Sequence, residues 1–399
     1  MTKQAIPSSI TGNGSEPAGS VLDHKFGTGD PYTLGVEEEY QLLDPETFDL
    51  VQHIDTMLDA VTGHELEARI NAELMQSVLE ITTPVCHNAG DVMRWLTKLR
   101  GYVTEIAHGR DTRVGSAGTH PFSLFERQRI TAKDRYRALI DQLQYVARRE
   151  LIFGMHVHVA VDEPEKAVQV VNGLLPHIAP LLALSASSPF WRGEPTGLAS
   201  SRQMVFSAFP RSGPPPRFRD YADYASVVGQ LEHSGCIADY THIWWDIRLH
   251  PRLGTIEIRI CDAVTRVEDA VAIAAYCQAL VKQLCERHDA GEEIPTYHRI
   301  LTSENKWLAA RYGLEAPVMD LATASRNRVP LARLIRRTVS ELRPHARELG
   351  SERELEGVLG ILGRGSSSDR QLRVYNANRD IVEVANAIAD ATEAIPVPA

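Results

Sequence analysis

Hydrophobic and polar positions alternate with a period of two in several stretches before about residue 262, and this pattern predicts strands. Residues 33–43 and 154–162 are the clearest, and residues 241–263 read as two strands about a turn at residues 251–254. An extended segment that ends at Pro84 and a short strand in "RVGSAGTHPF" are weaker. The short turn at residues 251–254 favours antiparallel pairing of the two strands that it joins.

Apolar residues at helical spacing predict helices over residues 89–111, 134–151 and 164–187. From Val267 onward the chain is dominated by this spacing, whereas "RSGPPPRFRDYADY", residues 211–224, predicts a proline-broken loop. Strands that come early and helices that come late, without an internal repeat, predict an α+β fold with a mostly antiparallel sheet.

Composition sets the class of protein. The chain has 399 residues, of which 43% are hydrophobic and 24% charged, as in ordinary globular proteins. Residues 1–30 are rich in Gly, Ser, Thr and Pro and predict a flexible leader, because they lack the basic start and apolar centre of a signal peptide. The apolar stretch from Gly173 is interrupted by prolines, so we expect no membrane segment.

Net charge and cysteine content argue against several kinds of partner and of structural site. A formal net charge of -10 argues against a nucleic-acid partner or an anionic membrane surface, because a phosphate-binding face needs concentrated Lys and Arg. The five cysteines are odd in number and contain no C-x-x-C pair, which argues against a disulfide framework and a zinc ribbon. We therefore expect a cytoplasmic protein.

Three consecutive glutamates interrupt the first strand. Side chains at i and i+2 leave a strand on the same face, roughly 7 Å apart, so Glu37 and Glu39 share a face and Glu38 points away. Two carboxylates so placed repel each other unless a cation lies between them. A solvated strand edge is the ordinary explanation of such a pair.

The same spacing recurs in two other predicted strands, with His156 and His158 in one and Glu257 and Arg259 in the other. Each pair alone has an ordinary explanation, half-buried histidines in the first case and a cross-strand ion pair in the second. Together the three pairs favour a ligand-binding site. Burying a charge without a partner costs roughly several kcal/mol, and a bound metal or anionic ligand would compensate for that cost. Carboxylate ligands suggest magnesium with a nucleotide.

Several motifs carry a resemblance to a known family. The chain closely resembles, over roughly residues 30–385, the bacterial carboxylate-amine ligases of the glutamate-cysteine ligase type 2 family. The motifs are "LGVEEEYQLLD", "NAELMQSVLEITTPV", "GTHPF", "GMHVHVAV", "SSPFWRGEPTGLASSR", "WWDIRLHPRLGTIEIRICDA" and "GRGSSSDRQL".

The resemblance implies a fold like that of glutamine synthetases and glutamate-cysteine ligases, in which a curved antiparallel sheet lines a magnesium and ATP site and helices pack outside. It implies a single catalytic domain over residues 31–390, followed by a tail, residues 391–399. The implied metal ligands are Glu37, Glu39, Glu73, Glu80, His156 and Glu257. The implied catalytic residues are Glu257 and Arg259, and the implied nucleotide- or substrate-binding residues are His158, Arg202, Arg259 and Arg370.

The implied reaction is the ATP-dependent joining of a carboxylate to an amine through an acyl phosphate, with ADP and phosphate as products. Glutamate and cysteine, which would give γ-glutamylcysteine, are the expected small-molecule substrates. Two alternatives stay open. One is a zinc hydrolase that uses His156 and His158 with Glu257, and the other is a non-catalytic nucleotide-binding protein. The oligomeric state is also open, with a homodimer among the alternatives.

Three further segments are candidates for the site. "PRSGPPPRFRDY" is a candidate lid whose arginines, Arg211, Arg217 and Arg219, could meet a substrate carboxylate. "ILGRGSSSDRQL", residues 361–372, could cradle phosphate through its backbone N–H groups or serve as a helix linker. Asn305, Trp307 and Arg311 are candidates for the substrate side, although core packing is the preferred role for Trp307.

Overall fold

A seven-stranded sheet organises the chain, whose computed structural model describes residues 23–323 and 327–394. The strands run in the order β2-β3-β1-β5-β9-β8, β4 also pairs with β1, and every pairing is antiparallel. The α+β fold class with an antiparallel sheet is thereby confirmed. The strands are β1 (Leu34–Leu43), β2 (Ile70–Ala72), β3 (Val78–Thr82), β4 (Arg113–Gly115), β5 (Met155–Ala160), β8 (Ile247–His250) and β9 (Thr255–Ile258).

The two faces of β1 meet different surroundings. Leu34, Val36, Glu38, Tyr40 and Leu42 are all buried, whereas the odd-numbered residues from 35 to 39 are partly exposed. On the buried face, Glu38 forms an ion pair with Arg100 of α2 (Ala89–His108), in which Nη2 of Arg100 lies 2.6 Å from Oε1 of Glu38. The alternation predicted the two faces correctly.

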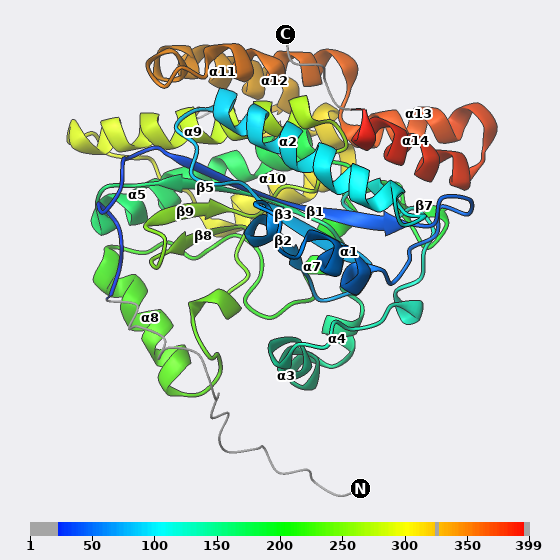
Figure 1. Cartoon of the computed structure of the whole chain (residues 1–399). Coiled ribbons are helices and arrows are strands. Elements are labelled where there is room, and N and C mark those ends of the chain that lie inside the picture. The colour runs from blue at the N-terminus through cyan, green and yellow to red at the C-terminus, as the bar shows by residue number, and fades with distance from the viewer. Residues whose placement is uncertain (1–22, 324–326, 395–399) are drawn as a thin grey trace, which may run out of the picture.

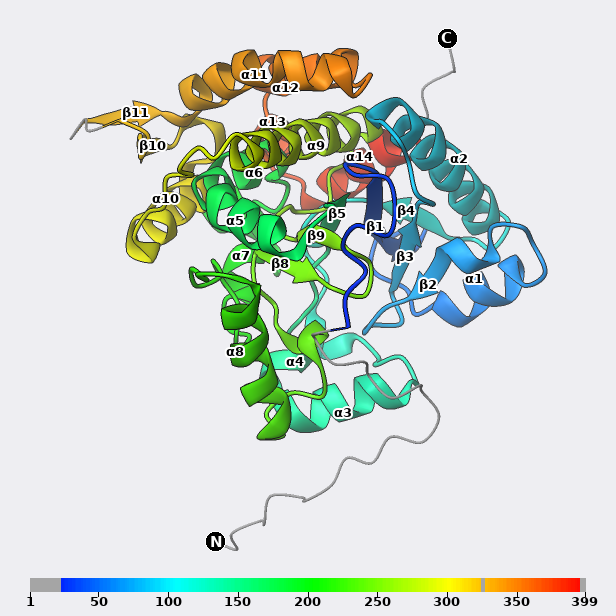
Figure 2. The same cartoon turned by 90° about the vertical axis from the view of Figure 1, so that its left-hand side faces the viewer.

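One face of the sheet is covered by helices. In Figures 1 and 2, α2 and α9 lie along this side and α11 and α12 lie outside α9. The long helix α9 is buried over most of its length because it is covered on several sides. These elements, with the neighbouring helices, are α1 (Ile54–Val61), α5 (Pro164–Leu174), α6 (Ile178–Ser185), α9 (Val267–Asp289), α11 (Leu331–Glu348) and α12 (Glu352–Arg364).

Shorter helices lie on the opposite side of the sheet, where α3, α4 and α8 form the lower part of the molecule in both views. The single helix predicted over residues 134–151 is two, α3 (Asp134–Leu143) and α4 (Tyr145–Arg148), because Gln144 adopts a φ of 51° that breaks the helix. Helix α8 (Tyr221–His233) begins inside the predicted loop, and α7 (Arg202–Phe206) was not predicted.

The C-terminal part is mainly helical, as predicted. It contains α10 (Arg299–Tyr312), α13 (Ser367–Asn378) and α14 (Ile381–Glu393). Two short strands, β10 (Pro317–Met319) and β11 (Arg328–Pro330), form a hairpin that was not predicted. A second small pair, β6 (Phe190–Trp191) and β7 (Glu194–Pro195), lies within the region of the "SSPFWRGEPTGLASSR" motif.

The ends of the described chain pack onto the fold. Phe26, within the predicted leader, is buried, and the N–H of Lys25 donates to the carbonyl of Pro251. Most of the predicted leader and residues 395–399 of the predicted tail lie outside the described residues. By length and composition, one helical run of the described chain, Pro164–Ser185, could cross a membrane, and 83% of its most apolar window is buried inside the molecule.

Candidate active site

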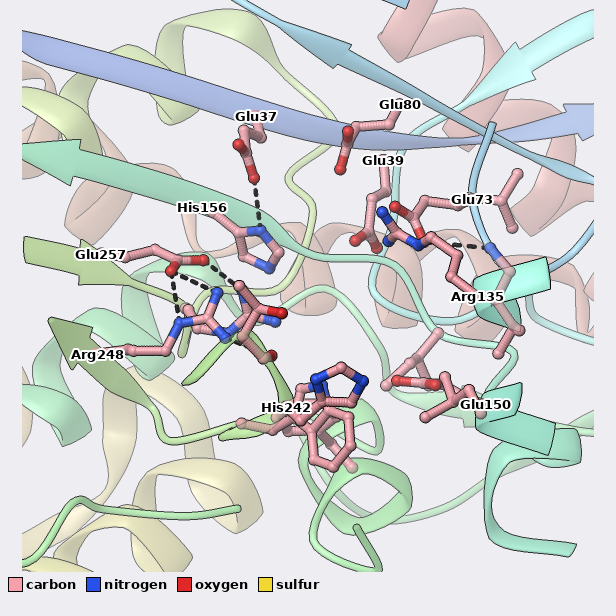
Figure 3. A pocket seen from close by; sticks show the side chains of 18 of the residues that line it. Glu37, Glu39, Glu73, Glu80, Arg135, Glu150, His156, His242, Arg248 and Glu257 are labelled. Carbon is pink, nitrogen blue, oxygen red and sulfur yellow. Dashed lines mark hydrogen bonds and ion pairs between the residues drawn. The ribbon is translucent and has the colours of Figure 1, made fainter. Parts of the chain in front are cut away.

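A cavity of about 560 Å³ opens on the sheet face that the large helices leave uncovered. Its lining comes from β1, β3, β5, β8 and β9 on one side and from α3, α7 and the loops around residues 73 and 242 on the other. Figure 3 shows these side chains pointing toward one another. The predicted site residues that line it are Glu37, Glu39, Glu73, Glu80, His156, His158, Arg202, Glu257 and Arg259.

Strand register brings the charged side chains together. Glu39 of β1 lies opposite Glu80 of β3, and Glu37 lies opposite His156 of β5. On the next pair, His158 lies opposite Glu257 of β9. Directly opposed residues lie about 4.5–5.5 Å apart across a sheet, so one face carries a continuous row of ionisable groups.

One group in this row has the geometry of a cation site. A carboxylate oxygen of Glu37, a ring nitrogen of His158 and a carboxylate oxygen of Glu257 all lie within 4.8 Å of one another. In the part of the chain that the structure describes, Nε2 of His158 has no hydrogen-bond partner, and it lies 3.6 Å from Oε1 of Glu37. His156 instead binds Oε2 of Glu37 through Nδ1 at 3.0 Å, so it is placed to orient that carboxylate.

Histidine contacts and burial control the charge state of this group. Burial alone would raise the pKa of Glu37, but its contacts with His156 and His158 hold that pKa well below its usual range. Burial and the charge of Arg259 lower the pKa of His156 to about 4, so its ring is neutral at neutral pH. A buried carboxylate that stays ionised is a suitable donor for a divalent cation.

A second acidic group lies beside the first. Glu39, Glu73 and Glu80 have few protein donors: Oε2 of Glu39 accepts from the N–H of Gly154 at 2.6 Å, and Oε2 of Glu73 from the N–H of Leu74 at 3.1 Å. Burial and the charge of Glu73 raise the pKa of Glu39 to about 7, and burial with the same neighbour raises that of Glu80 well above its usual range. This excess of negative charge fits divalent cations with oxygen preference.

Arginines face the acidic row. Glu257 is held by Arg248, with Nη2 at 2.7 Å from Oε2, and by Arg259, which donates from Nη1 to Oε1. Despite its burial, the two guanidinium groups keep the pKa of Glu257 well below its usual range. Nε of Arg259 and Nε of Arg202 are buried without a partner among the described residues, so both side chains retain donor capacity.

Gly154 makes the approach of Arg202 to the sheet possible. A Cβ atom at this position would lie 2.5 Å from Nη2 of Arg202. The glycine at the start of the "GMHVHVAV" motif therefore fits the packing of this guanidinium against β5.

Some predicted residues lie elsewhere. Arg370 does not line the cavity, and its Nη2 pairs with Asp269 at 2.7 Å, so its predicted contact with nucleotide or substrate has no support from this placement. Within residues 361–372, Ser366 caps a helix instead, because Ser366 and Asp369 form a capping box at the start of α13.

The other secondary candidates are also outside the cavity lining. Asn305 bonds to the backbone of Met319, and Arg311 donates to the carbonyl of Gly197. Core packing of Trp307 is wrong, since its exposure is 44%. The candidate lid arginines, Arg211, Arg217 and Arg219, do not line the cavity, and lid closure stays a prediction.

Sequence reasoning missed several charged or titratable groups of the lining, among them Arg135, Glu150, Arg248 and His250. The last two carried a usable signal. Arg248 and His250 repeat the i, i+2 spacing, and the turn at residues 251–254 places Arg248 opposite Glu257 in the hairpin. Arg135 and Glu150 lie at the ends of the α3–α4 segment, where no period of two marks them.

A family model described as glutamate-cysteine ligase family 2 matches residues 33–388. The chain belongs to this family. It is 45% identical over 361 residues to a Rubrobacter xylanophilus protein named "Putative glutamate--cysteine ligase 2-1", covering 90% of this chain and 95% of the relative. A Solibacter usitatus protein named "Putative glutamate--cysteine ligase 2" is 40% identical over 364 residues, covering 90% of this chain and 93% of the relative.

Solved structures share the fold of this family member at low identity. A bifunctional glutathione synthetase from Pasteurella multocida matches with a TM-score of 0.67 and 17% identity over 91% of this chain and 52% of the other. A glutamate-cysteine ligase from Francisella tularensis, in complex with AMP, matches with a TM-score of 0.63 and 14% identity over 93% and 91%. The predicted family is confirmed, and family membership indicates a ligase.

Proposed function

We propose that the chain is an ATP-dependent carboxylate-amine ligase that forms an amide through an acyl phosphate and releases ADP and phosphate. The observation that carries this proposal is the convergence of Glu37, His158 and Glu257 within 4.8 Å, on one cavity face, in a member of glutamate-cysteine ligase family 2. Glutamate and cysteine are the substrate pair that the family description suggests. The Francisella tularensis ligase binds AMP in its crystal structure, which supports a nucleotide substrate.

The acidic residues fit magnesium, which when bound would neutralise a triphosphate and align its γ-phosphoryl group with the substrate carboxylate. Glu37, Glu257 and His158 would hold one ion, and the neighbouring carboxylates Glu39, Glu73 and Glu80 would hold further charge. His156 keeps Glu37 in position through its 3.0 Å hydrogen bond.

The arginines would stabilise the charge that develops during phosphoryl transfer. Glu257 fixes Arg259 through Nη1, which leaves Nε of Arg259 available to donate to a phosphoryl oxygen. Arg248 donates to the other carboxylate oxygen, Oε2 of Glu257. Glu257 would therefore stay ionised while Arg259 binds the substrate. Nε of Arg202, which has no partner among the described residues, is a second donor at the same cavity.

The test is a coupled assay of ADP release from magnesium-ATP with glutamate and cysteine, together with hydroxylamine in place of the amine. Hydroxylamine converts an acyl phosphate into a hydroxamate, so glutamate-dependent hydroxamate and ADP are expected in equal amounts. ATP binding without ADP release for any carboxylate would support the non-catalytic alternative. Tightly bound zinc with ATP-independent hydrolysis would support the zinc hydrolase.

A further inference from the structure

The end of the cavity formed by the α3–α4 segment holds two charged groups that the phosphoryl-transfer steps leave unused. Arg135 lies at the start of α3, and Glu150 follows α4. Figure 3 shows both on the side of the cavity opposite Glu257 and Arg248. Both line the cavity, one as a cation and one as an acid.

Neither side chain is fixed by a protein partner, although the charge of Arg135 opposes the rise that burial causes in the pKa of Glu73. Within residues 23–323 and 327–394, no hydrogen bond or ion pair joins the side chain of Arg135 or Glu150 to another residue, and Arg135 only stacks over the ring of Tyr136 at 4.7 Å. At the opposite end of the cavity, by contrast, Glu257 is paired with both Arg248 and Arg259. An unpaired cation and an unpaired acid at one end of a cavity together match a zwitterionic ligand.

An apolar wall lies at the same end. Leu139 of α3, Ile152 and Phe206 of α7 all line the cavity, and Ile152 and Phe206 are only 8% and 6% exposed. The three belong to one small hydrophobic cluster on this side of the sheet. A ligand side chain placed here would leave water for apolar surface, worth about 25 cal/mol for each Å² buried.

We propose that this end of the cavity binds the amine substrate, and that the substrate is an α-amino acid with an apolar side chain. Its carboxylate pairs with Arg135 and its ammonium with Glu150, while its side chain packs on Leu139, Ile152 and Phe206. A side chain the size of leucine or methionine buries more area on this wall than that of cysteine. The inference rests on the proposed ligase function and specifies its acceptor.

The placement also gives the amine a path for its proton. The ammonium must lose one proton before its nitrogen can attack. The carboxylate of Glu150 accepts this proton, and burial makes it a stronger base by raising its pKa well above the usual range. The nitrogen lone pair then forms the C–N bond at the acyl carbon while the bond between that carbon and the phosphate oxygen breaks. The second proton leaves with the departing phosphate, which gives the neutral amide and hydrogen phosphate.

The experiment is titration calorimetry of the full chain with magnesium, a non-hydrolysable ATP analogue and glutamate present. Leucine and methionine are compared with cysteine and with 3-methylbutylamine, which is leucine without its carboxylate. We expect leucine and methionine to bind more tightly than cysteine and 3-methylbutylamine. Arg135→Gln should weaken leucine binding roughly 10- to 100-fold and leave 3-methylbutylamine unchanged, because only the amino acid loses a charge-assisted contact.

Glu150→Gln should weaken both ligands, and it should slow amide formation while glutamate-dependent hydroxamate formation persists. Two variants of exposed neighbours on α3, Arg137→Gln and Asp141→Asn, are the matched controls and should leave both measurements unchanged. Equal binding of leucine and 3-methylbutylamine to the wild type, or a wild-type response of Arg135→Gln, would overturn the inference. Absence of hydroxamate with every carboxylate tested would instead overturn the ligase function itself.

Discussion

Two adjacent residues, Glu37 and Glu38, show how far the surroundings decide the role of a side chain. Both lie on β1 and differ by one position in the sequence, so they point to opposite faces of the sheet. Glu38 is completely buried against Arg100, whereas Glu37 borders the cavity and bonds to His156. The same residue type therefore stabilises the fold at one position and forms part of the candidate metal site at the next.

Glu37→Gln tests the cavity side of this contrast. Glutamine keeps the shape of the side chain but removes one charge from the proposed cation site, so we expect ADP release to fall roughly 100-fold or more. The thermal midpoint should stay within about 2 °C of the wild type, because no arginine or lysine of the described chain is paired with this carboxylate. Steady-state rates at several magnesium concentrations and a melting curve by circular dichroism measure both effects. A wild-type rate at all concentrations would contradict the role of Glu37.

Glu38→Gln tests the other face and should behave in the opposite way. The variant leaves Arg100 charged and buried without its acid, which costs about 3–5 kcal/mol of stability. Urea unfolding measures that loss, and the rate per folded molecule should stay near wild type because the cavity is on the other side of the sheet. Replacing both partners, Glu38→Leu with Arg100→Met, should recover much of the stability. Failure of the double variant to recover it would show that the ion pair is not the cause.

At the scale of elements, the connection between α12 and α13 shows that the same amino-acid composition can fit either a phosphate-binding loop or a helix cap. Gly, Ser and Arg in residues 361–372 resemble a phosphate-binding loop, yet Ser366 accepts from the N–H of Asp369 and caps α13. Arg364 and Arg370 both pair with Asp269 of α9. The segment therefore ties the C-terminal helices to the central helix rather than facing the cavity.

Ser366→Ala separates these two roles. Loss of the cap should cost about 1 kcal/mol of stability, whereas Ser366→Gly should cost only a few tenths because glycine is tolerated at this position. The KM for ATP should be unchanged in both variants. Chemical denaturation and initial-rate kinetics are the measurements. An increase in KM without loss of stability would mean that the serine binds phosphate after all.

At the scale of the whole molecule, the sequence predicted which residues share a face of a strand, but it did not predict which strands pair with one another. Period-two spacing placed Glu37, Glu39, His158 and Glu257 on ionisable faces, and it also defined the β8–β9 hairpin. The pairing of β1 with β5 joins segments more than a hundred residues apart, for which local pattern carries no register. The family resemblance supplied that long-range information.

The groups that were missed share a physical reason. Arg135 reaches the cavity from the end of a helix, and Glu150 reaches it from an irregular segment. At such positions the spacing of residues along the chain does not predict where a side chain points. Arg370 is the opposite case: it was predicted to bind nucleotide or substrate, but it pairs with Asp269 and does not line the cavity. Its local composition fits both a phosphate loop and a capped helix. Only the ion pair between Arg370 of α13 and Asp269 of α9 distinguishes the two.

The charge of the whole cavity leads to a prediction about stability. Its lining includes the carboxylates of Glu37, Glu39, Glu73, Glu80, Glu150 and Glu257, and burial raises the pKa of several. A cation that binds only the folded state adds about 2.7 kcal/mol when its concentration is one hundred times its Kd. Magnesium should therefore raise the thermal midpoint by about 3 °C or more, relative to sodium at equal ionic strength. Scanning calorimetry measures the shift, and Glu37→Gln should reduce it. A larger shift with micromolar zinc than with millimolar magnesium would contradict the magnesium assignment, because His158 and His156 would then act as ligands of a softer metal.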